Sequence, residues 1–169
     1  MERHGTQSCL ARELLVIVEG PSDSGFVEAL CERLGQSCKV LVMRGNNPGK
    51  AKRMLRSVEF SKAIVLKDSH NHSIEFLNKI KKEIEHTHPN VYVVIVRKCI
   101  ESWIVSGIEC RNAEDSPNPV EDLRNILARE GVEHVKTEPL YRKLGERVDL
   151  QCMSKAESFV EFLSKLRDS

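Results

Sequence analysis

The sequence has little net charge and lacks the long apolar runs of membrane proteins. No run among its 169 residues approaches the roughly 20 apolar residues that span a bilayer. Residues 1–12 are polar and mixed, without the apolar centre of a secretory signal. The 26 basic residues nearly cancel the 25 acidic ones, so the bulk charge gives no reason to expect nucleic-acid binding. We therefore expect a cytoplasmic protein with no membrane partner, in which any nucleic-acid contact comes from a local basic patch.

The sequence also lacks the cysteine spacings of metal or redox motifs. Its six cysteines form no Cys-x-x-Cys pair and match no zinc-binding pattern. A cytoplasmic chain keeps its thiols reduced, so no disulfide is expected. Cys31 and Cys99 lie within apolar patterns, which favours core positions over reactive thiols. A chain of this length forms one domain and buries enough surface to fold without a covalent staple.

Short apolar runs alternate with segments of helical periodicity. The first run, residues 14–18, has five consecutive aliphatic residues and predicts a strand buried on both faces. Ser22 is a candidate N-cap for the helix that follows, and Gly35 a candidate end signal. Three more buried strands are predicted at 40–43, 63–66 and 91–96, and helices at about 22–34, 50–58 and 73–86.

This alternation predicts a three-layer, Rossmann-like α/β domain with a mostly parallel four-stranded sheet. Residues 1–12 are interpreted as an N-terminal tail and 13–107 as the α/β core. Residues 108–169 are predicted to form a helical C-terminal extension packed on the same domain. A short helix is expected at 100–106, a polar loop at 107–119, and further helices at 120–130, 139–146 and 155–167.

Acidic and metal-binding side chains follow three of the predicted strands. In parallel α/β sheets, ligands bind beyond the carboxyl ends of the strands. Neighbouring carboxylates repel each other unless a cation or a proton neutralises them, and Mg²⁺ prefers oxygen ligands. A histidine in the set favours Mn²⁺ over Mg²⁺. The candidate metal ligands are Glu19, Asp23, Asp68, His70 and Glu101.

Each of these residues also has a purely structural explanation. Glu19 could pair with Lys67, Asp23 suits the first turn of any helix, and Asp68 could cap one. Trp103, the only tryptophan, is more typical of a core than of a base-stacking surface. The functional interpretation therefore depends on the convergence of several side chains at one edge of the sheet.

A basic stretch runs from the end of the second strand into the next helix. Taken alone, such a stretch is more typical of a solvated helix face than of a nucleic-acid site. Beside a metal site, its cations would contact phosphates. The candidate nucleic-acid-binding residues are Arg44, Lys50, Lys52, Arg53, Lys67 and Arg97.

Two motifs resemble those of Toprim-type domains, which occur in primases, topoisomerases and nucleases of the overcoming-lysogenization-defect group. The segment Val18-Glu19-Gly20-Pro21-Ser22-Asp23, with Phe26 three residues on, resembles their opening motif of a strand-end glutamate followed by an aspartate. Asp68-Ser69-His70 matches only the first half of their D-x-D motif. Glu101-Ser102-Trp103 is similar to an E-x-W element of small Toprim-like proteins.

The resemblance implies a Toprim-like core, Mg²⁺ or Mn²⁺ as cofactor, and a reaction at a phosphodiester of DNA or RNA. It implies that Glu19 is an acid/base group or a ligand, that Asp68 is a ligand, and that Asp23 and Glu101 are ligands of a second site. His70 stands where an aspartate is expected, which removes one negative charge. Because the chain shows neither a tyrosine nucleophile signal nor an additional substrate-delivering domain, a metal-dependent nuclease is favoured over a topoisomerase or a primase.

Two other interpretations remain open. The incomplete D-x-D motif also suits a non-catalytic Toprim-like module that binds nucleic acid or a protein through a degenerate metal site. The turn at 45–50 could hold a phosphate at a helix N-terminus, although its glycine spacing is not that of a P-loop. The sequence does not determine the oligomeric state.

Overall fold

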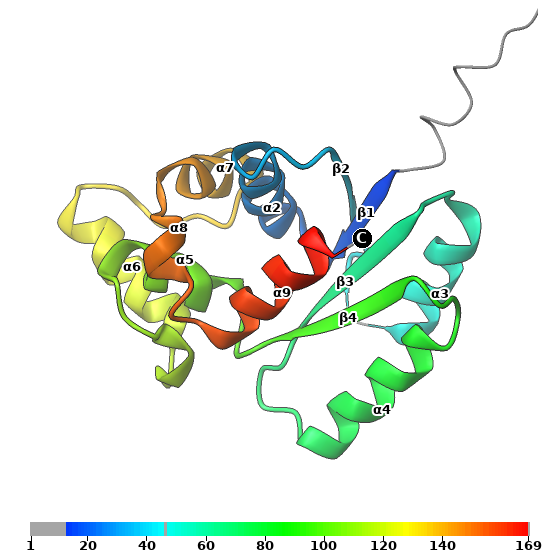
Figure 1. The fold of residues 1–169 in the computed structure, drawn as a ribbon. Helices are drawn as coiled ribbons and strands as arrows, with labels where there is room; N and C mark the ends of the chain where they lie inside the picture. The colour runs from blue at the N-terminus through cyan, green and yellow to red at the C-terminus, as the bar shows by residue number, and fades with distance from the viewer. Residues whose placement is uncertain (1–12, 46, 169) are drawn as a thin grey trace, which may run out of the picture.

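The computed structural model describes residues 13–45 and 47–168; the tail predicted at 1–12 lies outside the described residues. The chain is an α/β protein built on a parallel sheet of four strands in the order β2-β1-β3-β4 (Figure 1). The fold class predicted from the sequence is confirmed, and the sheet is parallel throughout. The strands are β1 (Leu14–Val18), β2 (Cys38–Val42), β3 (Lys62–Asp68) and β4 (Val91–Val96).

Helices cover both faces of this sheet. Alternate residues of β1 point to opposite faces, so Val16 and Val18 belong to one hydrophobic cluster and Leu15 and Ile17 to the other. Helices α3 and α4 lie on the second face, and α2, α5 and the C-terminal helices on the first (Figure 1). The helices are α2 (Pro21–Arg33), α3 (Pro48–Ser57), α4 (Ile74–Glu85), α5 (Ile100–Glu109), α6 (Pro119–Arg129), α7 (Glu138–Arg147), α8 (Leu150–Met153) and α9 (Glu157–Arg167), with a 3₁₀ turn η1 (Ala113–Asp115).

Two local predictions were wrong for identifiable reasons. Strand β2 is half-exposed rather than buried, because it lies at the edge of the sheet. Ser22 lies inside α2 and does not cap it. Pro21 occupies the start of the helix, where its fixed φ angle is favourable, so Gly20 becomes the cap residue.

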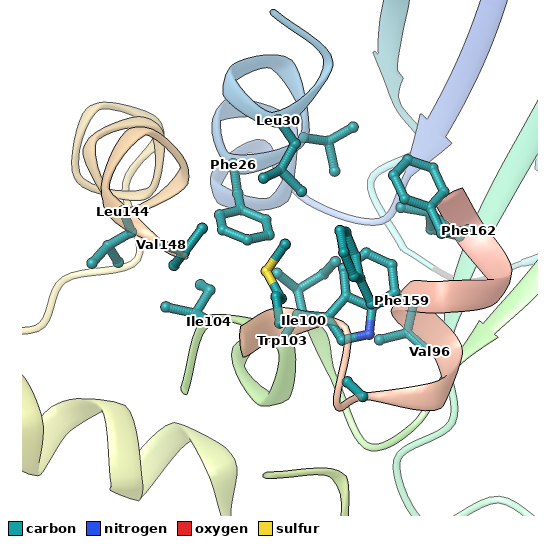
Figure 2. Close-up of a cluster of buried hydrophobic side chains, with 14 of the residues drawn as sticks. Phe26, Leu30, Val96, Ile100, Trp103, Ile104, Leu144, Val148, Phe159 and Phe162 are labelled. Carbon is teal, nitrogen blue, oxygen red and sulfur yellow. The ribbon is translucent and has the colours of Figure 1, made fainter. Parts of the chain in front are cut away.

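The C-terminal helices complete the core on the first face. Trp103 of α5 is buried, as predicted, and stacks on Phe162 of α9 with ring centroids 5.5 Å apart (Figure 2). Its Nε1 donates a hydrogen bond of 2.8 Å to Ser158 Oγ. Phe26 of α2 and Val148, just after α7, belong to the same cluster. The strand layer and the extension therefore share one hydrophobic core.

Helix α7 packs on α2 through very close backbone contacts. A Cβ atom at Gly25 would lie 2.5 Å from the Glu138 carbonyl oxygen. A Cβ atom at Gly145 would lie 2.8 Å from the Phe26 carbonyl oxygen. Both distances are too short for any side chain, so glycine at these two positions allows the two helices to approach. The start of α7 is thereby held against the start of α2.

The expectation that no disulfide forms was wrong: Cys110 and Cys152 are joined. They are 42 residues apart in sequence; Cys110 directly follows α5 and Cys152 lies in α8, and the packing of these two helices brings them together. The spacing of the cysteines carries no sign of this pairing. Cys31 and Cys99 are buried free thiols, which confirms their predicted core positions. Within the described residues, no helix combines the length and the apolar character needed to cross a bilayer.

Candidate metal centre

Three of the five predicted ligands lie together at the carboxyl edge of the sheet. Glu19 directly follows β1, Asp68 ends β3, and His70 follows two residues later. One ligand atom from each lies within 4.8 Å of the other two. We call Glu19, Asp68 and His70 the strand-end cluster. Because β1 and β3 are neighbours in parallel register, their last residues necessarily meet at this edge.

Glu19 reaches across to β3. Its Oε2 accepts a hydrogen bond of 2.6 Å from the Asp68 backbone N–H, which fixes the carboxylate beside the end of that strand. Its Oε1 lies 3.9 Å from Lys67 Nζ. Lys67 is only 2% exposed, so it differs from the surface phosphate contact expected from the sequence. It instead supplies a buried positive charge beneath the cluster.

Asp68 is a buried carboxylate without a donor. It is 9% exposed, and within residues 13–45 and 47–168 no N–H or O–H group donates a hydrogen bond to its carboxylate oxygens. His70 Nε2 lies 3.9 Å from Asp68 Oδ2. Burial raises the pKa of Asp68 well above its ordinary value, and the negative charges of Glu19, Asp23 and Glu101 raise it further. The site therefore holds more negative charge than its own residues neutralise.

Asp23 and Glu101 lie beside this cluster in the first turns of α2 and α5, and we call them the helix-start pair. Burial, and then the charge of Glu101, raise the pKa of Asp23 to about 7. Burial acts to raise the pKa of Glu101 as well, but the ammonium of Lys136 and a hydrogen bond from Tyr141 outweigh it and hold this pKa below its usual value. The two acids thus differ because Tyr141 and Lys136 outweigh burial at Glu101, whereas burial and neighbouring negative charge outweigh the weaker lowering influences at Asp23.

The extension contributes three side chains that the sequence did not reveal as site residues. Tyr141 Oη donates a 2.6 Å hydrogen bond to Glu101 Oε2, and Lys136 Nζ lies 3.4 Å from the same oxygen. His134 Nε2 is 2.9 Å from Tyr141 Oη. Since the only hydroxyl proton of Tyr141 points to Glu101, His134 donates to Tyr141 from Nε2. Nothing in the spacing of these residues links them to Glu101, which is why sequence reasoning missed them.

Three strands leave the sheet through residues in the left-handed backbone region. Arg44 follows β2 with φ 58°, His70 follows β3 with φ 45°, and Lys98 follows β4 with φ 65°. Such a conformation is uncommon for residues with a side chain and concentrates at functional sites. The Lys98 N–H donates to Ser69 Oγ at 2.8 Å, and the His70 N–H donates to the Lys98 carbonyl at 3.0 Å. These bonds hold the loop carrying His70 in place.

The remaining predicted phosphate contacts differ in their surroundings. Lys52 Nζ forms an ion pair of 2.9 Å with Glu83 of α4, so its side chain points toward that helix. Lys50 Nζ instead donates to the Arg44 carbonyl at 3.2 Å, so both lie at the carboxyl edge. Arg53 forms no ion pair with any described residue.

Arg97 directly follows β4, and its Nη1 lies 3.9 Å from Glu114 Oε1. Beside it, a small cavity of about 180 Å³ opens next to the strand-end cluster. The cavity is lined by His70, Asn71, Lys98, Cys99 and residues 117–120. In the turn at 45–50, the Asn47 side chain accepts from the Gly49 N–H at 2.8 Å and so caps α3 itself.

No protein-family model matches the sequence, and no curated protein matches it. Among solved structures, the chain is similar to the C-terminal region of the OLD protein of Xanthomonas campestris pv. campestris. That similarity has 16% sequence identity and a TM-score of 0.41, and it covers 92% of this chain and 80% of the other. A likeness at this level says nothing about activity, and the α/β class rests on the strand order and registers described above.

Proposed function

We propose that the strand-end cluster binds a divalent cation, Mg²⁺ or Mn²⁺, and that the protein uses it to process phosphodiester bonds of DNA or RNA. The observation that carries the proposal is the convergence of Glu19, Asp68 and His70, whose ligand atoms lie within 4.8 Å of one another. The resemblance of residues 18–26 to the opening of Toprim-type domains supports the same reaction class.

The residues fit such a cation by charge and by distance. Asp68 is buried without a donor and is surrounded by acids, so a cation would relieve both deficits. Two oxygen ligands at about 2.1 Å from one ion lie at most roughly 4.2 Å apart. Small side-chain rotations would therefore bring the three groups to coordination distance. The imidazole of His70 favours Mn²⁺ over Mg²⁺.

The surroundings of the cluster suit a phosphate. When bound, the cation would polarise a phosphoryl oxygen and lower the pKa of a coordinated water. Helices α2 and α5 begin at this edge, and neither has a side-chain cap. Their first backbone N–H groups and the positive ends of their dipoles favour an anionic group there. Arg44, Lys50 and Lys98 lie around the same edge and would contact the flanking phosphates.

Two observations favour the non-catalytic alternative. Lys67 already places an ammonium group 3.9 Å from Glu19, and His70 replaces the second aspartate of the D-x-D pattern. A cluster neutralised in this way could bind nucleic acid without a cation. The affinity of such binding would fall steeply with salt, because it would depend on counterion release.

Calorimetric titration of Mn²⁺ and Mg²⁺ into metal-free protein tests the proposal. Glu19→Gln and Asp68→Asn remove charges from the cluster, and Glu75→Gln removes an exposed charge of α4 as a matched control. We expect metal binding in the wild type and the control, and its loss in both cluster variants. Cleavage of end-labelled single- and double-stranded DNA and RNA should then require Mn²⁺ or Mg²⁺ and stop with EDTA.

Absence of binding at millimolar metal would rule out the metal-dependent function. Salt-sensitive binding of nucleic acid by the same metal-free protein would then support the alternative. Metal binding without cleavage of any of the four substrates would separate the cation site from the proposed reaction.

A further inference from the structure

The helix-start pair has a cation of its own. Lys136 Nζ lies 3.4 Å from Glu101 Oε2, and its charge also lowers the pKa of Asp23. Glu101 is almost completely buried, whereas the Lys136 side chain is 56% exposed. The ammonium therefore contacts a buried acid on one side and is open to solvent on the other. Its side chain comes from the extension rather than from the α/β core.

Lys136 is held there by the packing of α7 on α2. The Thr137 side chain caps α7 by accepting from the Leu140 N–H, and Lys136 directly precedes it. Glu138 lies against Gly25, so the start of α7 cannot move away from the first turns of α2 without losing this close contact. Tyr141, one turn into the same helix, donates to Glu101. Two residues of one rigid segment thus engage the same carboxylate.

The charges of the whole edge balance with one divalent cation. The strand-end cluster and the helix-start pair together contain four carboxylates: Glu19, Asp23, Asp68 and Glu101. Two ammonium groups face them, Lys67 at Glu19 and Lys136 at Glu101. When all six groups are ionised, two negative charges remain, which is the charge that one divalent cation neutralises. A second divalent cation would leave two excess positive charges at the buried edge, against only one if the Lys136 ammonium were absent.

We propose that Lys136 takes the place of a second metal ion, so that the centre binds one divalent cation per chain at the strand-end cluster. This inference rests on the proposed function and deepens it. The resemblance to Toprim-type nucleases had implied that Asp23 and Glu101 bind a second metal ion. In this chain they hold the Lys136 ammonium, whose exposed side is open to a substrate phosphate.

The number of bound Mn²⁺ ions tests this inference directly. Calorimetry at pH 7.5, checked by counting bound Mn²⁺ with electron paramagnetic resonance, should give one ion for the wild type. Lys136→Met removes the charge while keeping the length of the side chain, and two ions are expected. Lys136→Arg retains the cation and should stay at one. Lys143→Met, on the exposed side of α7, is the matched control and should also stay at one.

A double variant locates the second ion. Glu101→Gln added to Lys136→Met removes the carboxylate that would hold it, and the count should return to one. Because Lys136→Met leaves a buried charge unpaired, the metal-free variant should melt at a lower temperature than the wild type. Added Mn²⁺ should then raise its melting temperature more than it raises that of the wild type.

The outcomes separate this inference from the proposed function. Two ions in the wild type, or one ion in both wild type and Lys136→Met, would overturn the role of Lys136 while leaving the metal centre intact. An equal Mn²⁺-dependent rise in melting temperature for both proteins would also count against it. No ion in the wild type would overturn the metal centre itself.

Discussion

Two buried acidic side chains of this protein, Glu114 and Asp68, have opposite surroundings. Glu114 accepts hydrogen bonds from the Glu157 N–H at 2.9 Å and from the Ser158 N–H at 3.1 Å, and the Ser158 hydroxyl also donates to it. Arg97 adds a positive charge at 3.9 Å. Asp68 is almost as buried, yet no described residue donates to its carboxylate oxygens.

The difference separates a structural acid from a candidate ligand. The first N–H groups of a helix have no partner within the helix, and Ala156 offers α9 no side-chain cap. Glu114 fills that role from a distant turn, so its charge is fully used inside the fold. Asp68 keeps its lone pairs free at the edge of the sheet. Burial alone therefore does not distinguish these two acids; what distinguishes them is that described residues donate to Glu114 and not to the Asp68 carboxylate.

Among the substitutions, the largest expected effect on folding at fixed pH comes from Glu114→Ala. Its removal leaves the start of α9 and the Ser158 hydroxyl without their acceptor, which should lower the free energy of unfolding by about 3 kcal/mol. Urea denaturation measures this loss. Glu157→Ala, an exposed acid in the first turn of the same helix, is the control and should cost less than about 1 kcal/mol. The Mn²⁺ affinity of Glu114→Ala should stay within about threefold of the wild-type value. A larger fall in the folded variant would mean that Glu114 is not a purely structural acid.

Asp68→Asn should behave in the opposite way. It removes a charge that Glu19, Asp23 and Glu101 repel, so the metal-free protein should be as stable as the wild type or more stable. Mn²⁺ affinity should fall by more than about a hundredfold, beyond the effect of altering a group that only supports a ligand. Urea denaturation in EDTA and calorimetry measure the two quantities. A loss of stability like that of Glu114→Ala would mean that Asp68 is structural too.

The pH dependence of stability sharpens the comparison through Asp23. Its pKa is about 7 in the folded protein against an ordinary value of 3.8, so between these pH values the folded state holds a proton that the unfolded state has lost. Stability should therefore fall as pH rises through this window. Relative to Asp23→Asn, which does not titrate, the metal-free wild type should lose a few kcal/mol, roughly 4 at most, between pH 4 and 7.5. A pH-independent difference between the two proteins would contradict the shifted pKa.

The smallest effect is expected from His70→Asp, which restores the D-x-D pattern. The left-handed backbone at this position, φ 45°, accommodates aspartate. An added carboxylate should raise Mg²⁺ affinity by about tenfold, and the ratio of Mn²⁺ affinity to Mg²⁺ affinity should fall. Calorimetry with both ions measures the change, and His72→Asp, on the same loop, is the control. Unchanged Mg²⁺ affinity would place His70 outside the coordination sphere.

Local sequence patterns were sufficient for the α/β class and for the edge at which the site forms. The aliphatic run at 14–18 predicted a strand buried on both faces, and β1 is an inner strand of the sheet, between β2 and β3. Because parallel strands end on the same side, the positions of Glu19 and Asp68 in sequence already predicted their meeting. The exposure of β2 could not be predicted, because an apolar run does not reveal which strand lies at the edge.

The sequence by itself determined the strands, their direction and the acids at their ends, since these follow from short-range periodicity and from the geometry of parallel sheets. Only the tertiary structure decided which charges those acids meet. The buried Lys67 lies beside Glu19, and Lys136 and Tyr141 contact Glu101 from the extension. Glu114 accepts from the start of α9, 43 residues later in the sequence. Such pairings depend on how helices far apart in sequence pack together, and electrostatic interactions act through space without leaving a periodic trace in the sequence.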